Sequence, residues 1–256
     1  MKPTTPAQRS HSYLIVRALL AFTFVCLFSL GVVNAGYIGS DLVVVTMTDG
    51  QGRSASQGIA NPFANLPPQA QVPPFVQDMI NERFQLSDGD TVLGWIDSLG
   101  VELIGDPVAS INFNVTAASE VTVSVSSATV SFSALNNPPA SAEAEVTLTD
   151  NNGNGAAMIE TINGNAGLFR AIYNGSTQYA ALLGDSSIGG GSVTFSEDTS
   201  GPIAGSVTSI AARFDFKLSA GDSASGSGRF VVVPEPSFAI FLLSSCATLA
   251  AARRRR

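Results

Sequence analysis

Residues 111–133, INFNVTAASEVTVSVSSATVSFS, decide the fold class of this chain. Apolar side chains alternate there with polar ones: asparagines separate Ile111, Phe113 and Val115, and the valines at 121, 123 and 125 alternate with threonine and serine. Successive side chains of a β-strand point to opposite faces of its sheet. The alternation therefore predicts antiparallel strands with one face in a core and the other in water. The same pattern recurs over 142–148 and 212–218.

Turn signals separate these segments. Asn-Gly pairs stand at 152–153, 154–155, 163–164 and 174–175, and such pairs favour the tight turns of β-hairpins because they tolerate a positive φ. Strands of about 5–8 residues between such turns are typical of a β-sandwich or jelly roll. The sequence leaves closure into a barrel open. It predicts a mainly β, antiparallel, sandwich-like or jelly-roll-like domain.

The segment before residue 91 is less regular. Residues 41–48 predict a strand, and the proline-rich residues 49–74 predict a long loop. In FVQDMINERF, residues 75–84, apolar residues recur at helical spacing after Pro74, which favours one short helix. Trp95 lies among Val92, Leu93 and Ile96, and we expect it in the core.

Both ends of the chain have the composition of processing signals. Basic residues and no acid precede an uncharged apolar run over 18–33, which ends at Val33-Asn34-Ala35. This order is typical of a secretory signal peptide, so we expect residues 1–35 to form a signal helix and cleavage to occur between Ala35 and Gly36. The alternative is an uncleaved membrane anchor.

The last 24 residues have three parts. An uncharged apolar segment spans residues 238–252, or ~22 Å as a helix, which is short for a bilayer core of ~30 Å. Terminal positive charge would hold the end on the cytoplasmic side. The residues that flank the apolar segment are Val233, Pro234, Glu235, Pro236 and Ser237 on one side and Arg253, Arg254, Arg255 and Arg256 on the other.

This tail, residues 233–256, resembles the PEP-CTERM sorting signal: a Pro-Glu-Pro motif, a hydrophobic segment and a terminal arginine cluster, in that order. The resemblance implies recognition and cleavage by an exosortase, a transient membrane anchor through the short C-terminal helix, and a final location at the cell surface or in the extracellular matrix of a bacterium that makes exopolysaccharide. The alternative is an ordinary C-terminal membrane helix.

The domain between these signals, residues 36–232, is acidic and chemically sparse. It holds 19 Asp and Glu against six Lys and Arg, a net charge of −13, which excludes nucleic acid as a partner. It contains neither His nor Cys, so a Ser-His-Asp or Cys-His site and a histidine-bound zinc are excluded. A carboxylate pair is the remaining route to catalysis.

Two local patterns suggest ligands. The segment DNNGNG, residues 150–155, places Asp150, Asn152 and Asn154 at the first three ligand positions of a calcium loop. The acid expected at position 12 is replaced by Thr161, and Glu160 comes one residue early. The alternative is therefore a plain hairpin turn.

Two aromatic residues flank the Asn-Gly pair at 174–175. Tyr173 and Tyr179 are candidates for stacking on sugar rings, with core or edge packing as the alternative.

Together these patterns predict a non-catalytic surface or matrix protein associated with exopolysaccharide, without a required cofactor. Signal peptidase and exosortase are its expected partners during export. The alternatives are a calcium-assisted carbohydrate-binding module and a carboxylate-pair glycoside hydrolase.

Overall fold

The computed structural model describes residues 36–64, 75–161 and 167–234, and every regular element in these ranges is a β-strand. The bounds are β1 Gly36–Asp49, β2 Ser54–Ala60, β3 Phe75–Ile80, β4 Phe84–Asp88, β5 Thr91–Ile104, β6 Val108–Ala117, β7 Val121–Asn136, β8 Pro139–Thr149, β9 Ala156–Glu160, β10 Phe169–Tyr173, β11 Thr177–Leu182, β12 Ser186–Ile188, β13 Ser192–Pro202, β14 Ser206–Leu218 and β15 Ser223–Val232.

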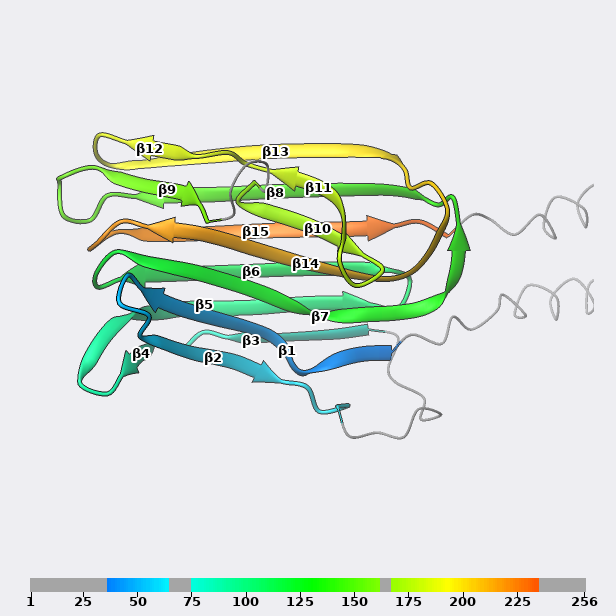
Figure 1. Cartoon of the computed structure of the whole chain (residues 1–256), viewed down its shortest axis with the longest axis horizontal. Coiled ribbons are helices and arrows are strands. Elements are labelled where there is room, and N and C mark those ends of the chain that lie inside the picture. The colour runs from blue at the N-terminus through cyan, green and yellow to red at the C-terminus, as the bar shows by residue number, and fades with distance from the viewer. Residues whose placement is uncertain (1–35, 65–74, 162–166, 235–256) are drawn as a thin grey trace, which may run out of the picture. The chain divides into compact units, whose positions relative to one another are not determined.

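The strands form two antiparallel sheets packed face to face (Figure 1). The eight-stranded sheet runs in the order β11-β10-β14-β7-β1-β2, with β9 and β12 attached beside β14. The seven-stranded sheet runs in the order β13-β8-β15-β6-β5-β3, with β4 also paired to β5. The prediction of a mainly β, antiparallel sandwich is confirmed.

The alternating residues fill the space between the sheets. Val121, Val123 and Val125 of β7 and Ile111 of β6 have no exposed surface. At the centre the ring of Phe113, from the seven-stranded sheet, lies 5.0 Å from Phe214 and 5.7 Å from Phe216 of β14, measured between ring centroids. Phe169 lies 4.9 Å from Phe214, so the aromatic side chains form one continuous cluster across the sandwich.

The helix predicted for residues 75–84 is wrong. Residues 75–80 form the edge strand β3, which pairs with β5, and residues 84–88 form β4 on the other half of the same long strand. Val76 is 9% exposed whereas Met79 is 48% exposed, so the apolar positions do not share one face as a helix would require. Pairing with the edge of β5 satisfies the backbone N–H and C=O groups of these residues, whereas an isolated helix of this length is only marginally stable in water.

Two further expectations need correction. Part of the loop predicted for residues 49–74 is the strand β2, which pairs with β1 from Asp41 to Thr48. Trp95 is not in the core: it pairs with Thr116, whose neighbours Val115 and Ala117 are buried, so it projects from the outer face of the seven-stranded sheet. The Trp95 side chain is half-buried on that outer face.

The turn prediction holds at residues 174–175. Asn174 has a φ of 48° and Gly175 a φ of 84°, and this pair of positive values lies in the three-residue connection that joins β10 to β11 as a hairpin. Gly153 and Gly155 have φ values of 79° and 90°. The Asn-Gly pair at 163–164 lies outside the described residues.

The first and last strands of the sandwich meet at one end. The Tyr37 hydroxyl of β1 donates to the Leu103 carbonyl at 3.3 Å, and the Val232 amide of β15 donates to the Pro107 carbonyl at 2.9 Å. Leu103 and Pro107 flank the turn between β5 and β6, so Gly36 and Val232 lie at the same end of the domain. Residues 36–64, 75–161 and 167–234 contain no helix that is long and apolar enough to cross a membrane.

Candidate functional site

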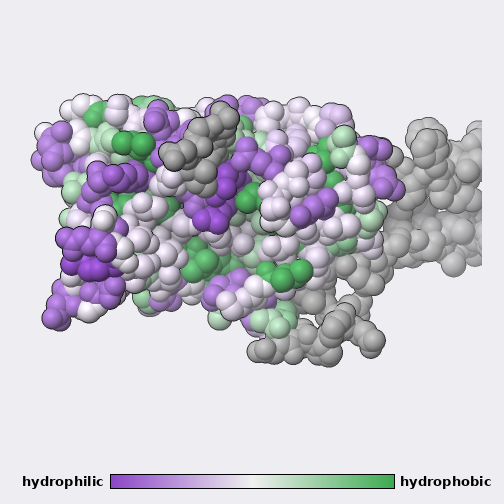
Figure 2. All heavy atoms as spheres, viewed as in Figure 1, coloured by the Kyte–Doolittle hydropathy of each residue, from purple (hydrophilic) through white to green (hydrophobic). Residues whose placement is uncertain are grey.

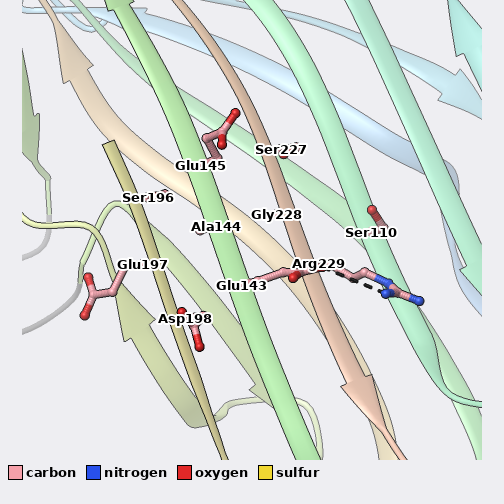
Figure 3. Close-up of a pocket in the computed structure, with 10 residues that line it drawn as sticks. All are labelled: Ser110, Glu143, Ala144, Glu145, Ser196, Glu197, Asp198, Ser227, Gly228 and Arg229. Atoms are coloured by element: carbon pink, nitrogen blue, oxygen red, sulfur yellow. Dashed lines mark ion pairs between the residues drawn. The ribbon is translucent and has the colours of Figure 1, made fainter. Parts of the chain in front are cut away.

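A shallow open groove lies on the seven-stranded sheet, across β6, β15, β8 and β13. Its volume is about 330 Å³ (Figure 3). The residues that line it are Ser110, Glu143, Ala144, Glu145, Ser196, Glu197, Asp198, Ser227, Gly228 and Arg229.

Strand register builds this groove from two rows of side chains. Arg229 is paired with Ser110 on one side and with Glu143 on the other, and Glu143 is paired with Asp198. In the next row, Ser227 lies beside Glu145, which is paired with Ser196. Because paired residues of antiparallel strands project from the same face, long acidic side chains and short serines adjoin on the outer surface.

The groove has an acidic lining. Arg229 Nη1 lies 3.9 Å from Glu143 Oε1, which offsets part of one negative charge. Glu197 lies on the opposite face of the edge strand β13, where its exposed carboxylate accepts a hydrogen bond from the Leu183 amide at 2.7 Å. Glu143, Glu145 and Asp198 are exposed to solvent.

This arrangement suits hydrogen bonding better than hydrolysis. A glycosidase needs one carboxyl that stays protonated, and a desolvated environment is the usual means of achieving this. The exposed acids of the groove lack such surroundings. They can instead accept hydrogen bonds from hydroxyl groups, and the serines Ser110, Ser196 and Ser227 can both donate and accept.

The Asp150 segment is organised as a turn. The Asp150 carboxylate accepts hydrogen bonds from the amides of Gly153 at 2.7 Å, Gly155 at 3.0 Å and Asn152 at 3.2 Å. Burial opposes ionisation of this carboxyl, but the bonds from the amides of Gly155, Gly153 and Asn152 hold its pKa below the ordinary value.

The amide side chain of Asn152 is also engaged: it donates to the Ala220 carbonyl at 2.8 Å and accepts from the Asn154 amide at 3.0 Å. In the described part of the chain no three acidic, histidine or cysteine side chains converge as a metal site. The side-chain oxygens of Asp150 and Asn152 therefore have partners within the loop, as in a turn, and calcium binding by Asp150, Asn152 and Asn154 stays a prediction.

The two tyrosines occupy different surroundings. The Tyr179 ring stacks on Phe230 with centroids 5.3 Å apart, and its hydroxyl lies 2.9 Å from the Ala140 carbonyl and 3.2 Å from that of Gly201. Burial raises the pKa of this hydroxyl. Tyr179 is half-buried with its ring against Phe230, and its proposed contact with sugar stays a prediction. Tyr173 is half-buried at the end of β10, and its proposed contact with sugar stays a prediction.

The processing residues are only partly described. Gly36 is the first residue of β1, and Val233 follows β15 with its amide bonded to the Pro139 carbonyl at 2.8 Å. Pro234 is the last described residue. The remaining predicted sorting and cleavage residues lie outside the described ranges: Val33, Ala35, Glu235, Pro236, Ser237, Arg253, Arg254, Arg255 and Arg256.

The sequence does not predict the groove. The alternation over 142–148 already marks Glu143 and Glu145 as outward-facing. No local signal indicates that β15 lies beside β8, or that β13 lies on its other side, and only these pairings bring Arg229 and Asp198 next to Glu143.

No protein-family model and no curated protein matches this chain. Among solved structures, it is similar to the enzymatically active domain of the bacteriophage CBA120 tailspike protein 4, at 10% identity over 63% of this chain and 20% of that chain, with a TM-score of 0.23. It is also similar to the infectious bursal disease virus Gx strain structure, at 11% identity over 80% of this chain and 71% of that one, with a TM-score of 0.28. The chain thus spans one fifth of the tailspike chain, and neither likeness bears on its function.

Proposed function

We propose that this protein is an exported, non-catalytic component of the cell surface or extracellular matrix, sorted and cleaved through its PEP-CTERM-like tail and associated with exopolysaccharide. One observation carries the proposal: the strands of the folded domain begin at Gly36 and end at Val232, next to the two predicted processing sites. Cleavage at both predicted sites would leave every strand of the described residues intact.

The placement of the ends supports the same proposal. Gly36 and Val232 lie at one end of the sandwich, so both predicted processing sites adjoin a single end of the domain. Five residues separate Val232 from the apolar segment at 238–252, a reach of at most ~18 Å. Before cleavage the domain would stand close to the membrane with that end toward it.

The chemistry of the surface favours a binding or structural role. The groove is open, its acids are exposed, and its remaining lining is serine, alanine, glycine and arginine. Such a surface offers hydrogen bonds to hydroxyl-rich polymers without the desolvated carboxyl that glycoside hydrolysis needs. The calcium-assisted alternative is less favoured because the oxygens of Asp150 accept bonds from their own loop.

The test is expression of the full chain in an exosortase-bearing Gram-negative host and in the same strain without exosortase. We expect a protein without its tail at the surface of the first strain and an intact, membrane-bound chain in the second, by mass spectrometry of cell fractions. A matched variant with Arg253, Arg254, Arg255 and Arg256 replaced by serine should remain uncleaved. An identical uncleaved product in both strains would refute the sorting proposal, and release of reducing sugar from matrix polysaccharide would refute the non-catalytic role.

A further inference from the structure

Both outer faces of the sandwich carry polar side chains, and some of these bond to each other across neighbouring strands. On the eight-stranded sheet, neighbouring hydroxyls bond to each other, as in Thr46 with Ser56 at 2.8 Å and Thr48 with Ser54 at 3.0 Å. Figure 2 shows hydrophilic side chains over much of this face, with small apolar areas between them. Part of its hydrogen-bonding capacity is thus satisfied within the protein.

The centre of the seven-stranded sheet is rich in polar side chains without such bonds. Within the ranges that the structure describes, several outward amides and hydroxyls there form no side-chain hydrogen bond, although the neighbouring pair Thr147 and Thr194 are bonded at 2.8 Å. These unbonded groups belong to Ser98, Ser110, Asn112, Asn114, Ser196, Ser225 and Ser227. They form a continuous field of donors and acceptors directed to the solvent.

The lone tryptophan of the chain borders this field. Trp95 projects from β5 on the same face, and the guanidinium carbon of Arg83 lies 4.9 Å from its ring centroid. Arg83 is itself 58% exposed and is tied to Asp97 by an ion pair with an Nε–Oδ1 distance of 3.2 Å. An aromatic ring covered on one side by an exposed arginine is a surface on which a ligand can stack once the arginine moves aside.

Between the Trp95 ring and the groove, the strand β5 presents a glycine. Gly100 of β5 has no side chain, and a Cβ added there would lie 2.2 Å from the Asn112 Oδ1 atom, so the Asn112 side chain lies across β5. Across the sheet, three strand spacings separate β5 from β8. Along β6, Thr116, the partner of Trp95, lies four residues from Asn112. These steps give a track of roughly 20 Å, the length of an oligomer rather than of a single sugar.

Charge restricts the ligand further. Glu102, Glu143, Glu145 and Asp198 project from this face, and Arg229 is already next to Glu143. A polymer with carboxylate or sulfate groups would be repelled by these acids. The complementary partner is a hydroxyl-rich chain without negative charge.

We propose that the outer face of the seven-stranded sheet binds an uncharged polysaccharide, which stacks on Trp95 and bonds to Asn112, Asn114 and the serines of the groove. This inference rests on the proposed function and names the surface through which the protein would hold a matrix polymer. Arg83 would move aside from the ring or stay as a second wall beside the bound sugar.

The experiment uses the full chain in mild detergent, titrated with dextran, xylan and soluble cellulose oligomers, and in parallel with alginate and chitosan. We expect saturable binding to at least one uncharged glycan, unaffected by 0.5 M salt, with a shift in tryptophan fluorescence. Trp95 is the only tryptophan, so this signal reports on the proposed site alone. Trp95→Ala should weaken retention on the same glycan about tenfold or more.

Asn112→Ala provides a second variant, because this exposed side chain has no bonded partner to lose in the described domain; it should weaken binding and leave the melting temperature unchanged. Gln178→Ala is the control, because this side chain is exposed on β11 of the other sheet, and it should bind as the unaltered chain does. The proposal would be overturned if the chain bound none of the uncharged glycans, or if Trp95→Ala bound them equally well. It would also be overturned by binding to alginate alone, or by salt-sensitive binding to chitosan alone. A chain that is sorted and cleaved normally yet binds no uncharged glycan would refute this site without refuting the proposed function.

Discussion

Replacing Gly228 by alanine would place a methyl group where β15 lies directly against two phenylalanine rings. A Cβ at this position would lie 2.4 Å from Cε2 of Phe169 and 2.8 Å from Cε2 of Phe214, and both rings are fully buried. Favourable carbon–carbon contacts need about 3.5–4.0 Å, so the rings or the strand must move by roughly 1 Å. Overpacking of this kind costs about 1–3 kcal/mol.

The conformational gain of alanine over glycine in a strand, about 0.5–1 kcal/mol, offsets part of that cost. The net loss is then at most about 2.5 kcal/mol and centres on about 1 kcal/mol, and each kcal/mol lowers the melting temperature of a domain this size by about 2–4 °C. Gly201→Ala on the edge strand β13 is the control, because no atom lies within 4 Å of its added Cβ, and it should be neutral or slightly stabilising.

The assay is urea unfolding of the full chain in mild detergent, followed by the fluorescence of Trp95. The midpoint for Gly228→Ala should fall while the slope of free energy against urea stays constant, since the same surface is exposed on unfolding. If Gly228→Ala proves as stable as Gly201→Ala, the close packing of β15 on the aromatic cluster is refuted.

Three further predictions concern charged and polar groups. Asp215→Asn should lower the free energy of unfolding in urea by about 3 kcal/mol, because this 5% exposed carboxylate is shared by the guanidinium groups of Arg170 and Arg213. A loss of stability no larger than that of Asp198→Asn, at an exposed position, would contradict this role. Burial opposes ionisation of Asp150, but amide hydrogen bonds lower its pKa, so the unfolded chain takes up a proton first and the melting temperature should fall as the pH drops below about 4. Asp150→Asn should flatten this trend, and a calcium-induced rise in melting temperature that this variant abolishes would support the calcium hypothesis. Burial raises the pKa of Tyr37 to about 12, so stability should decrease from about pH 10 upward, because the phenol of the unfolded chain ionises first. Melting curves of Tyr37→Phe between pH 8 and 12 should lack this part of the decrease, and an unchanged profile would exclude Tyr37 as its source.

The sequence was informative wherever the controlling interactions are local. The alternation at Val121, Val123 and Val125 predicted which side chains are buried, because the two faces of a strand differ in consecutive residues. The Asn-Gly pair at 174–175 predicted a hairpin because its positive φ values are a property of those two residues. The Asp150 turn is local in the same sense, since its carboxylate bonds to amides within five residues.

Only the tertiary structure decided the features that depend on which strands meet. Residues 75–84 have helical spacing but form two strands, because the two halves of β5 offer them an unpaired edge. Trp95 follows the apolar residues Val92 and Leu93 yet faces outward, and the groove requires β15 to enter between β6 and β8 from more than 70 residues away in the chain. The period of a strand encodes which face is buried but not which partner lies beside it. That choice is made by burial of the whole core, to which residues far apart in sequence contribute together.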